Sequence, residues 1–301
     1  MLAFLGAGYH HRADRYQENV KNAIDFLVQH QRDDGDLYID ADANSSRSAW
    51  LYSHAIGTIA LCEAYGMTQD PDLKGPAQKA INFIIDSQHP SRGGWRYSPA
   101  YGADTSVSGW MTMALKSAEL AELKVDKKVY DQIVHWLDMS QASDAQPYLY
   151  RYNPYAPDTD KQRHGRKPSK AMTAVGLLMR LYTGWERSDQ NMILGAQTLT
   201  QNLPQLGTSS RPRRDTYYWY YATQVMFHMG GDYWTSWNQA LHPLLTRSQI
   251  KNGAFAGSWS PLAPIPDQWG SYGGRLYVTT LNLLSLEVFY RHLPIYDDTA
   301  Q

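Results

Sequence analysis

The chain has 301 residues, of which 43% are hydrophobic and 19% charged, and its formal net charge is −1. This is the composition of a folded protein, and no apolar run reaches the roughly 18 residues that a membrane-spanning helix requires. The near-neutral charge argues against binding to a polyanion through bulk charge, so nucleic acid is not an expected partner.

The numbers of cysteine and aromatic residues narrow the possible classes of protein further. The single cysteine, Cys62, rules out a disulfide framework and a thiolate metal cluster, and we expect it to be a small buried side chain. One thiol is compatible with a reducing or an oxidising compartment, so the localisation stays open. Ten Trp and 22 Tyr are many for a helical protein and predict an aromatic-lined hollow.

Apolar residues recur at helical spacing along the whole chain, without sustained alternation of period two. Helices that are apolar nearly all round alternate with helices that are apolar on one side only. The first kind is expected at the N-terminal residues 1–8 and at 48–65, 104–121, 170–184, 215–229 and 276–291. The second kind is expected at 17–31, 75–88, 126–139, 188–202 and 233–248.

Two short patterns repeat along the chain. Ala60-Leu61 and Ala114-Leu115 both begin an Ala-Leu-x-x-Ala pattern. The second pattern, Gln-x-x-x-Gly-x-apolar, runs from Gln31 to Leu37 and from Gln249 to Phe255, and with one added residue from Gln88 to Trp95. The Gln amide can satisfy backbone groups at a helix end, the Gly permits a turn, and we expect the large apolar residue to pin the loop.

These Gln-x-x-x-Gly-x-Trp/Phe patterns, joined to alternating helices, resemble squalene cyclases and the β subunits of protein prenyltransferases. The resemblance covers nearly the whole chain. It implies an all-α fold, the α/α toroid, in which a barrel of inner helices is surrounded by outer helices. The chain supplies about six inner and five outer helices, so we expect one domain over residues 1–301 whose first outer helix lies upstream.

The resemblance also implies where catalytic groups would lie. Class II terpene cyclases carry Asp-x-Asp-Asp-Thr-Ala at the start of an inner helix, and the matching stretch here keeps only Asp104 and Thr105. The middle Asp, which donates the proton in that family, corresponds to Ala103. Without a carboxylic acid there, protonation of an alkene has no donor at that position.

Zinc chemistry is incomplete in the same way. Prenyltransferases bind zinc through Asp-x-Cys and a later His. The comparable positions are Asp215, Tyr217 and Val278, so one ligand of three remains. We therefore expect no metal and no cofactor.

The inner helices of a toroid run in one direction, so the loops that enter them meet at one rim. These loops hold 15 Lys and Arg and 9 Asp residues, whereas the leaving loops hold 5 Lys and Arg and 8 acidic residues. Lys170, Arg214 and Arg275 each precede or begin an inner helix, whose N-terminus adds partial positive charge. They predict an anion site at that rim, and a solvated charged loop is the alternative.

The candidate catalytic residues are Asp104 and Asp215, because each opens an inner helix where the family places its acid and its zinc carboxylate. Each is followed by Thr, so helix capping is the competing role. Trp110, Tyr217 and Tyr277 are the candidate ligand-binding aromatics. Core packing is the competing role for the run 217–221, since a helix turns only one or two of five successive side chains inward.

Three functions remain open from the sequence. The first is a squalene-cyclase-like repeat protein that binds a lipid, glycan or peptide in a central aromatic cavity with a basic rim. The second is an isoprenoid- or polysaccharide-acting enzyme on the same frame, which would be favoured by an Asp104 that has a raised pKa and faces another carboxylate in a deep pocket. The third is a protein-interaction scaffold. All three stay open because one fold can carry many different functions.

Overall fold

The computed structural model describes residues 1–13, 15–40 and 45–291, and their secondary structure is mainly helical. The described β-structure is a hairpin of two-residue strands, β1 (Gly207–Thr208) and β2 (Arg211–Pro212), with isolated bridges elsewhere. The sequence predicted no strands, and this hairpin departs from that prediction because it depends on a loop bent by Gly207, which has a φ of 77°. The expected helical class is confirmed.

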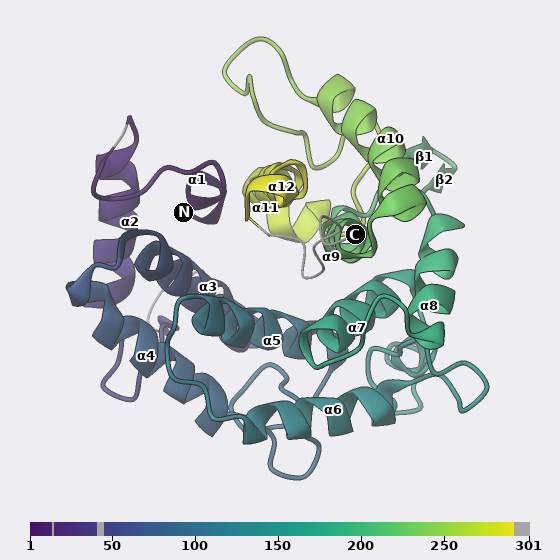
Figure 1. Ribbon diagram of the computed structural model, residues 1–301. Coiled ribbons are helices and arrows are strands. Elements are labelled where there is room, and N and C mark those ends of the chain that lie inside the picture. Colours follow the sequence, from purple (N-terminus) through teal and green to yellow (C-terminus); the bar gives the residue numbers. More distant parts are fainter. Residues whose placement is uncertain (14, 41–44, 292–301) are drawn as a thin grey trace.

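One set of six helices packs in a closed order. Each contacts the next one in the set, and the last returns to the first (Figure 1). In chain order the set is α1 (Leu2–Gly6), α3 (Trp50–Thr68), α5 (Thr105–Leu120), α7 (Lys170–Tyr182), α9 (Thr216–Met229) and α11 (Gly270–Leu286). We call these the ring helices.

The intervening helices lie outside the ring in Figure 1. They are α2 (Gln17–Gln29), α4 (Pro71–Asp86), α6 (Lys128–Ser140), α8 (Gln190–Thr200) and α10 (Gly231–Ser248). Helix α4 packs between α3 and α5, α6 between α5 and α7, and α8 between α7 and α9. Short helices η1 (Arg47–Ala49), η2 (Arg163–Arg166) and α12 (Val288–Arg291) complete the described elements.

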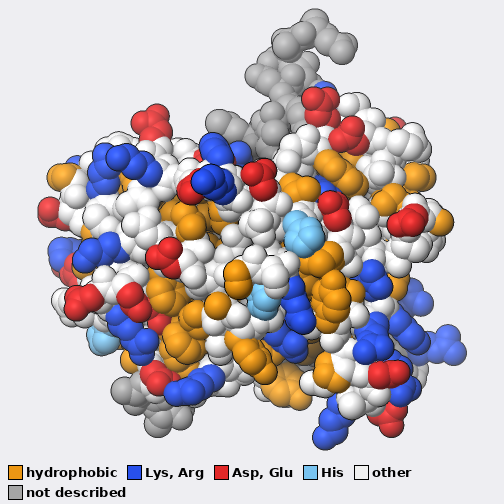
Figure 2. Space-filling model, turned by 90° about the horizontal axis from the view of Figure 1, so that it is seen from below, with side chains coloured by type: hydrophobic (Ala, Val, Ile, Leu, Met, Phe, Trp, Pro, Cys, Tyr) orange, Lys and Arg blue, Asp and Glu red, His pale blue; other side chains and the backbone are white. Residues whose placement is uncertain are grey.

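Burial separates the two sets as the periodicity predicted. All 14 residues of α9 are buried, whereas α10 buries only Trp237, Leu241 and Leu245. Because the apolar stripe of an outer helix packs against the ring, its charged face is turned outward. On the face seen in Figure 2, basic and acidic side chains are accordingly interspersed.

Helix α11 is less buried than the other long ring helices. Six of its 17 residues are buried, and Tyr272 and Leu276 are 87% and 81% exposed. Its main contacts are with α1, α9 and α12, which cover one side of it. The sequence predicted a helix buried nearly all round, and the structure instead leaves one face of α11 uncovered among the described residues.

The Gln-containing loops tie each hairpin to its neighbours, with one correction to the predicted register. The Gln31 amide donates to Pro76 O at 2.9 Å, and the Gln88 amide to Val129 O at 3.3 Å. The Gln249 amide, however, donates to Gly257 O, and the buried residue of that loop is Trp259, which donates to Leu245 O.

Phe255, the predicted anchor of that loop, is 57% exposed, whereas Trp259 is 1% exposed. The loop after α10 is longer than the first two, so the Gly-x-aromatic unit that reaches the core comes four residues later. The prediction for Phe255 was therefore wrong.

A hydrogen bond from each buried loop residue to a ring helix repeats around the ring. In four loops the backbone N–H of the loop residue donates to a side chain of the next ring helix, at 2.9–3.2 Å. The pairs are Leu37 with His54, Trp95 with Ser108, Tyr150 with Thr173, and Trp259 with Thr279. Because a buried N–H without a partner is costly, these bonds fix the loop register.

No helix among the described residues is both long and apolar enough to cross a membrane.

Candidate functional site

The ring has two rims with different chemistry. The N-terminal rim is where ring helices begin, and the C-terminal rim is where they end. Residues near the starts of α3, α5 and α9 contact one another at the first rim, and the ends of α1, α3, α5 and α11 line one cavity at the second. The ring helices that meet in these contacts therefore run in the same direction, as expected.

Asp104 opens α5 at the N-terminal rim and is fully buried. Its Oδ1 accepts a hydrogen bond from the backbone N–H of Val107 at 2.9 Å, so the predicted cap is confirmed. Its Oδ2 accepts from the Tyr152 hydroxyl at 3.0 Å and lies 3.7 Å from Arg96 Nε. Burial raises the pKa of Asp104 to about 7, although these partners oppose the shift.

A chain of hydroxyls joins three ring helices beside this carboxyl. The Tyr52 hydroxyl of α3 donates to Ser106 Oγ of α5 at 2.7 Å, and Ser106 Oγ lies 2.7 Å from the Tyr217 hydroxyl of α9. Burial raises the pKa of Tyr52 and Tyr217, so both are neutral phenols. Tyr217 is thus a hydrogen-bonded member of the rim.

Asp215 opens α9 and caps it in the same way, through the backbone N–H of Tyr218 at 3.0 Å. Burial raises the pKa of Asp215 to about 6, against the opposing charge of Lys170. Lys170 Nζ lies 4.6 Å from the centre of the Tyr218 ring, where a cation is attracted to the aromatic face. The structure therefore brings Lys170 and Asp215 together.

Asp267, which sequence reasoning missed, completes this part of the rim. Its Oδ2 accepts from the backbone N–H and the hydroxyl of Thr216, at 2.8 and 2.6 Å. Arg214 is buried and donates to two loop carbonyl oxygens, those of Ala263 and Ile265. Burial, and then the charge of Asp267, raise the pKa of the neighbouring Tyr277.

Arg275 lies in a different environment. Its Nη1 donates to Ser258 Oγ at 3.1 Å, and its guanidinium carbon is 4.0 Å from the Phe255 ring centre. The three cations predicted to form an anion site each have partners within the protein.

Trp110 lies in the ring interior, one turn deeper than the N-terminal rim. It stacks on Tyr220 with ring centres 5.4 Å apart and meets Tyr221 edge to face at 5.7 Å. The three side chains are at most 4% exposed. Helices α5 and α9 are separated by α7 in the ring order, so this contact crosses the interior, where aromatic side chains pack against one another.

The larger of two described cavities lies at the C-terminal rim and has a volume of about 770 Å³. Its lining is mainly apolar and comes from α1, α3, α5, α11, α12 and the residues just after them. The lining residues are Leu5, Gly6, Ala7, Gly8, Cys62, Glu63, Gly66, Met67, Ser117, Leu120, Ala121, Leu283, Leu286, Glu287, Tyr290 and Arg291.

Two carboxyl side chains and one guanidinium interrupt this apolar wall. Arg291 Nη2 donates to Glu63 Oε1 at 2.5 Å, and its side chain is 3% exposed. Burial raises the pKa of the third group, Glu287, to about 7, Arg291 opposes the shift, and Glu63 adds to it. Sequence reasoning missed all three, although Glu63 had a visible signal as a lone acid within an apolar helical run.

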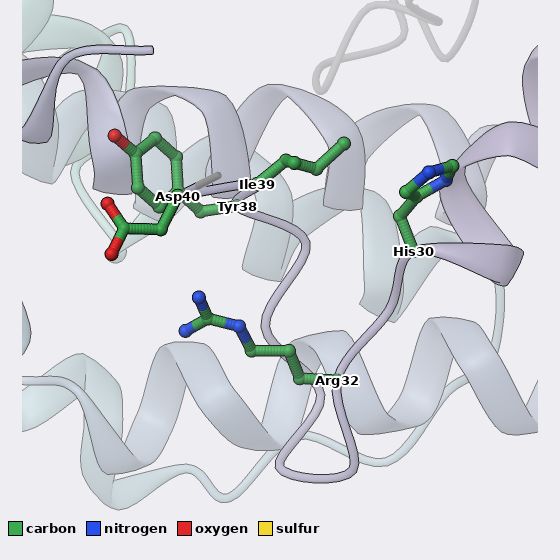
Figure 3. A pocket seen from close by; sticks show the side chains of 5 residues that line it. All are labelled: His30, Arg32, Tyr38, Ile39 and Asp40. Atoms are coloured by element: carbon green, nitrogen blue, oxygen red, sulfur yellow. The ribbon is translucent and has the colours of Figure 1, made fainter. Parts of the chain in front are cut away.

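The smaller cavity, of about 380 Å³, follows α2 (Figure 3). It is lined by His30, Arg32, Tyr38, Ile39 and Asp40. Arg32 forms an ion pair with buried Asp36 at 3.3 Å. This cavity is half the size of the other and is lined by a single loop.

No group of three or more His, Cys, Asp or Glu side chains in the described part of the chain is placed to hold a metal ion.

The chain is structurally similar to a type II terpene cyclase, MstE from Scytonema, in its apo form. The identity is 13%, the TM-score is 0.43, and the match covers 89% of this chain and 97% of that one. A variant of the same cyclase in complex with the product merosterolic acid A matches with 14% identity and the same TM-score, over 90% and 96%. No family model and no curated protein matches the chain. The likeness transfers no residue roles.

Proposed function

We propose that the chain is a single α/α toroid domain that binds an apolar, lipid-like ligand at the C-terminal end of its ring. This modifies the arrangement expected from the sequence, in which an aromatic cavity lay beneath a basic rim. The Trp110 region is packed, and the basic residues Lys170, Arg214 and Arg275 have partners within the protein.

The observation that carries the proposal is the cavity of about 770 Å³. This volume lies within the range of small-molecule sites, about 300–1,000 Å³, and such sites combine apolar walls with a few polar groups. Leu120 and Tyr290 at its margin are 71% and 82% exposed, so covering them with an apolar ligand removes apolar surface from water.

The apolar wall favours a lipid or isoprenoid over the glycan and peptide considered from the sequence. A sugar or an extended peptide carries many donors and acceptors, and each must find a partner when it leaves water. The wall offers mainly Leu, Ala, Gly and Met side chains. A lipid-like ligand requires far fewer partners.

An enzyme acting on isoprenoids or polysaccharides is the second candidate, and Asp104 favours it. A buried carboxyl with a pKa of about 7 can donate a proton near neutral pH. Both its oxygens already accept hydrogen bonds within the protein, so a substrate would have to displace Tyr152 or the cap. Filling the cavity at the C-terminal rim requires no displacement of Tyr152 or of the cap, so we prefer ligand binding there over an enzyme that uses Asp104.

The test is ligand binding to the purified chain, measured by native mass spectrometry and thermal shift against isoprenoid lipids and oligosaccharides. Ser117→Phe places a ring in the cavity, and we expect it to abolish lipid binding while the circular dichroism spectrum is kept. Ser53→Phe, at an exposed position of α3, is the matched control and should bind as the parent does. Equal binding by both variants would refute the site. Binding of none of the lipids or oligosaccharides by the parent chain would favour the protein-interaction scaffold.

A further inference from the structure

The cavity at the C-terminal rim has a polar end that differs in charge from the rest of its lining. Glu63 belongs to α3, Glu287 follows α11, and Arg291 belongs to α12. These three are the only Lys, Arg, Asp, Glu or His residues among those that line the cavity. They therefore decide what charge a ligand meets there.

Arg291 is already occupied by the protein. It pairs with Glu63, and its Nη1 lies 3.5 Å from the Tyr220 hydroxyl of α9. With both carboxylates ionised, one guanidinium faces two negative charges, so the polar end carries one uncompensated negative charge. An anionic ligand head would be repelled by both carboxylates when they are ionised, and Arg291 Nη2 already donates to Glu63.

Glu287 is the group without a partner. Its Oε2 is buried and accepts no hydrogen bond from the described residues, and Arg291 Nε likewise donates none. Native proteins rarely leave buried polar atoms unpaired, because burial removes the hydrogen bonds that these atoms make to water. Glu287 lines the cavity, and a ligand head that donates a hydrogen bond would supply the partner that this carboxyl lacks once the side chain turns toward it.

We propose that this cavity selects an apolar molecule whose head donates a hydrogen bond, an alcohol or an amine, and that Glu287 accepts it. The inference rests on the proposed function and deepens it. The raised pKa of Glu287 agrees with a partly buried carboxyl that accepts no hydrogen bond from the described residues. Carboxylate and diphosphate heads are disfavoured by the negative charge of Glu63 and of ionised Glu287.

Gly6 supports the assignment through packing. A Cβ at Gly6 would lie 2.5 Å from Glu287 Oε2 and 2.7 Å from Arg291 Cδ. The helix α1 therefore passes close to both side chains and limits where they can go. A larger residue at position 6 would therefore have to displace these side chains from the polar end of the cavity.

The experiment compares four ligands that share one apolar chain and differ in the head, namely farnesol, farnesylamine, farnesoic acid and farnesyl diphosphate. Dissociation constants are measured by titration calorimetry on the full chain at neutral pH. We expect the alcohol and the amine to bind at least about tenfold more tightly than the acid and the diphosphate, because a tenfold change corresponds to about 1.4 kcal/mol, the worth of one buried polar contact.

Variants assign the preference to Glu287. Glu287→Gln keeps an acceptor oxygen but removes the charge, so we expect the amine to lose about tenfold and the alcohol to change less than about threefold. Glu287→Leu should weaken the alcohol and the amine alike. Glu122→Gln, at an exposed position of the same rim outside the cavity, is the control and should leave all four constants unchanged.

The outcomes separate this inference from the proposed function. Binding of none of the four ligands would refute the lipid site itself. Equal binding of all four, or tightest binding of the diphosphate, would leave the site standing and overturn the assignment of its head group. A preference for alcohol and amine that survives Glu287→Leu would overturn the role of Glu287 alone.

Discussion

Acidic side chains lie at both rims of the ring, and their hydrogen-bond partners differ between the two rims. At the N-terminal rim, Asp104 and Asp215 each accept a hydrogen bond from the helix that they open. At the C-terminal rim, Glu287 has an oxygen without a partner, and a cavity lies beside it. Helix N-termini present free N–H groups that carboxylates satisfy, whereas C-termini present carbonyls that carboxylates cannot. At the second rim Glu63 pairs with Arg291, so the carboxyl of Glu287 is the one that remains available for a ligand.

The largest expected effect is the dependence of the free energy of unfolding on pH, which tests how the acidic groups of the two rims differ in burial. The folded-state pKa of Asp104 is about 7, above its ordinary 3.8, so the folded state binds the proton that the unfolded state releases between these values. Stability should therefore fall as pH rises from about 4 to about 7, by an amount on the order of 4 kcal/mol from this group, since one unit is worth about 1.36 kcal/mol.

Asp104→Asn keeps an oxygen that can cap α5 and removes the titration. Urea unfolding of the parent and the variant at several pH values measures the difference, which should appear as a flatter pH profile for the variant. Glu287→Gln should flatten the profile less, because Glu287 is only partly buried. Identical profiles for the parent and Asp104→Asn would contradict the burial of that carboxyl.

Two glycines test how rigid each rim is. A Cβ at Gly93, near the N-terminal rim, would lie 2.0 Å from the backbone oxygen of Gln132, and Gly93 has a φ of +73°. Gly93→Ala should cost about 2–4 kcal/mol, because neither the conformation nor the backbone oxygen can adjust easily.

Gly6→Ala at the C-terminal rim should cost less, about 1 kcal/mol, because it meets the ends of the flexible side chains of Glu287 and Arg291. Urea midpoints at constant m-value measure both changes. A larger loss for Gly6→Ala than for Gly93→Ala would reverse the comparison.

The smallest effect concerns the basic residues of the N-terminal rim. Lys170→Ala and Arg275→Ala should leave ligand dissociation constants within about twofold, because neither side chain lines the cavity. The same titrations used for the four farnesyl ligands measure this. A tenfold loss of diphosphate binding in either variant would restore the anion site predicted from the sequence.

The loops show where prediction from the sequence stops. The Gln-containing pattern located two of its three turns correctly, and Leu37 and Trp95 are buried as expected. In the loop after α10 the same pattern selected Phe255, whereas Trp259 fills the core. Two aromatic residues, Phe255 and Trp259, follow Gln249 within ten positions, and only the distance from the loop to the ring decides which one reaches it.

The residues of the two rims likewise divide into those that local sequence predicts and those that only tertiary contacts bring together. Asp104 and Asp215 were chosen because the family resemblance places an acid and a zinc carboxylate there, and their caps were predictable because a cap is decided by the three residues that follow it. Tyr52, Ser106 and Tyr217 could not be grouped from the sequence, because 111 positions separate the last two. Arg291 and Glu63 are 228 positions apart and meet only because the ring closes.

The sequence by itself determined the helices, their alternation between buried and one-sided faces, and the caps of α5 and α9. These features arise from interactions between residues three or four positions apart, which periodicity records directly. The tertiary structure decided that the aromatic interior is packed and that a cavity with an unpaired carboxyl opens at the opposite rim. Those properties depend on the contact between α1 and α11, which lie near opposite ends of the sequence. Local sequence patterns do not record contacts between residues so far apart.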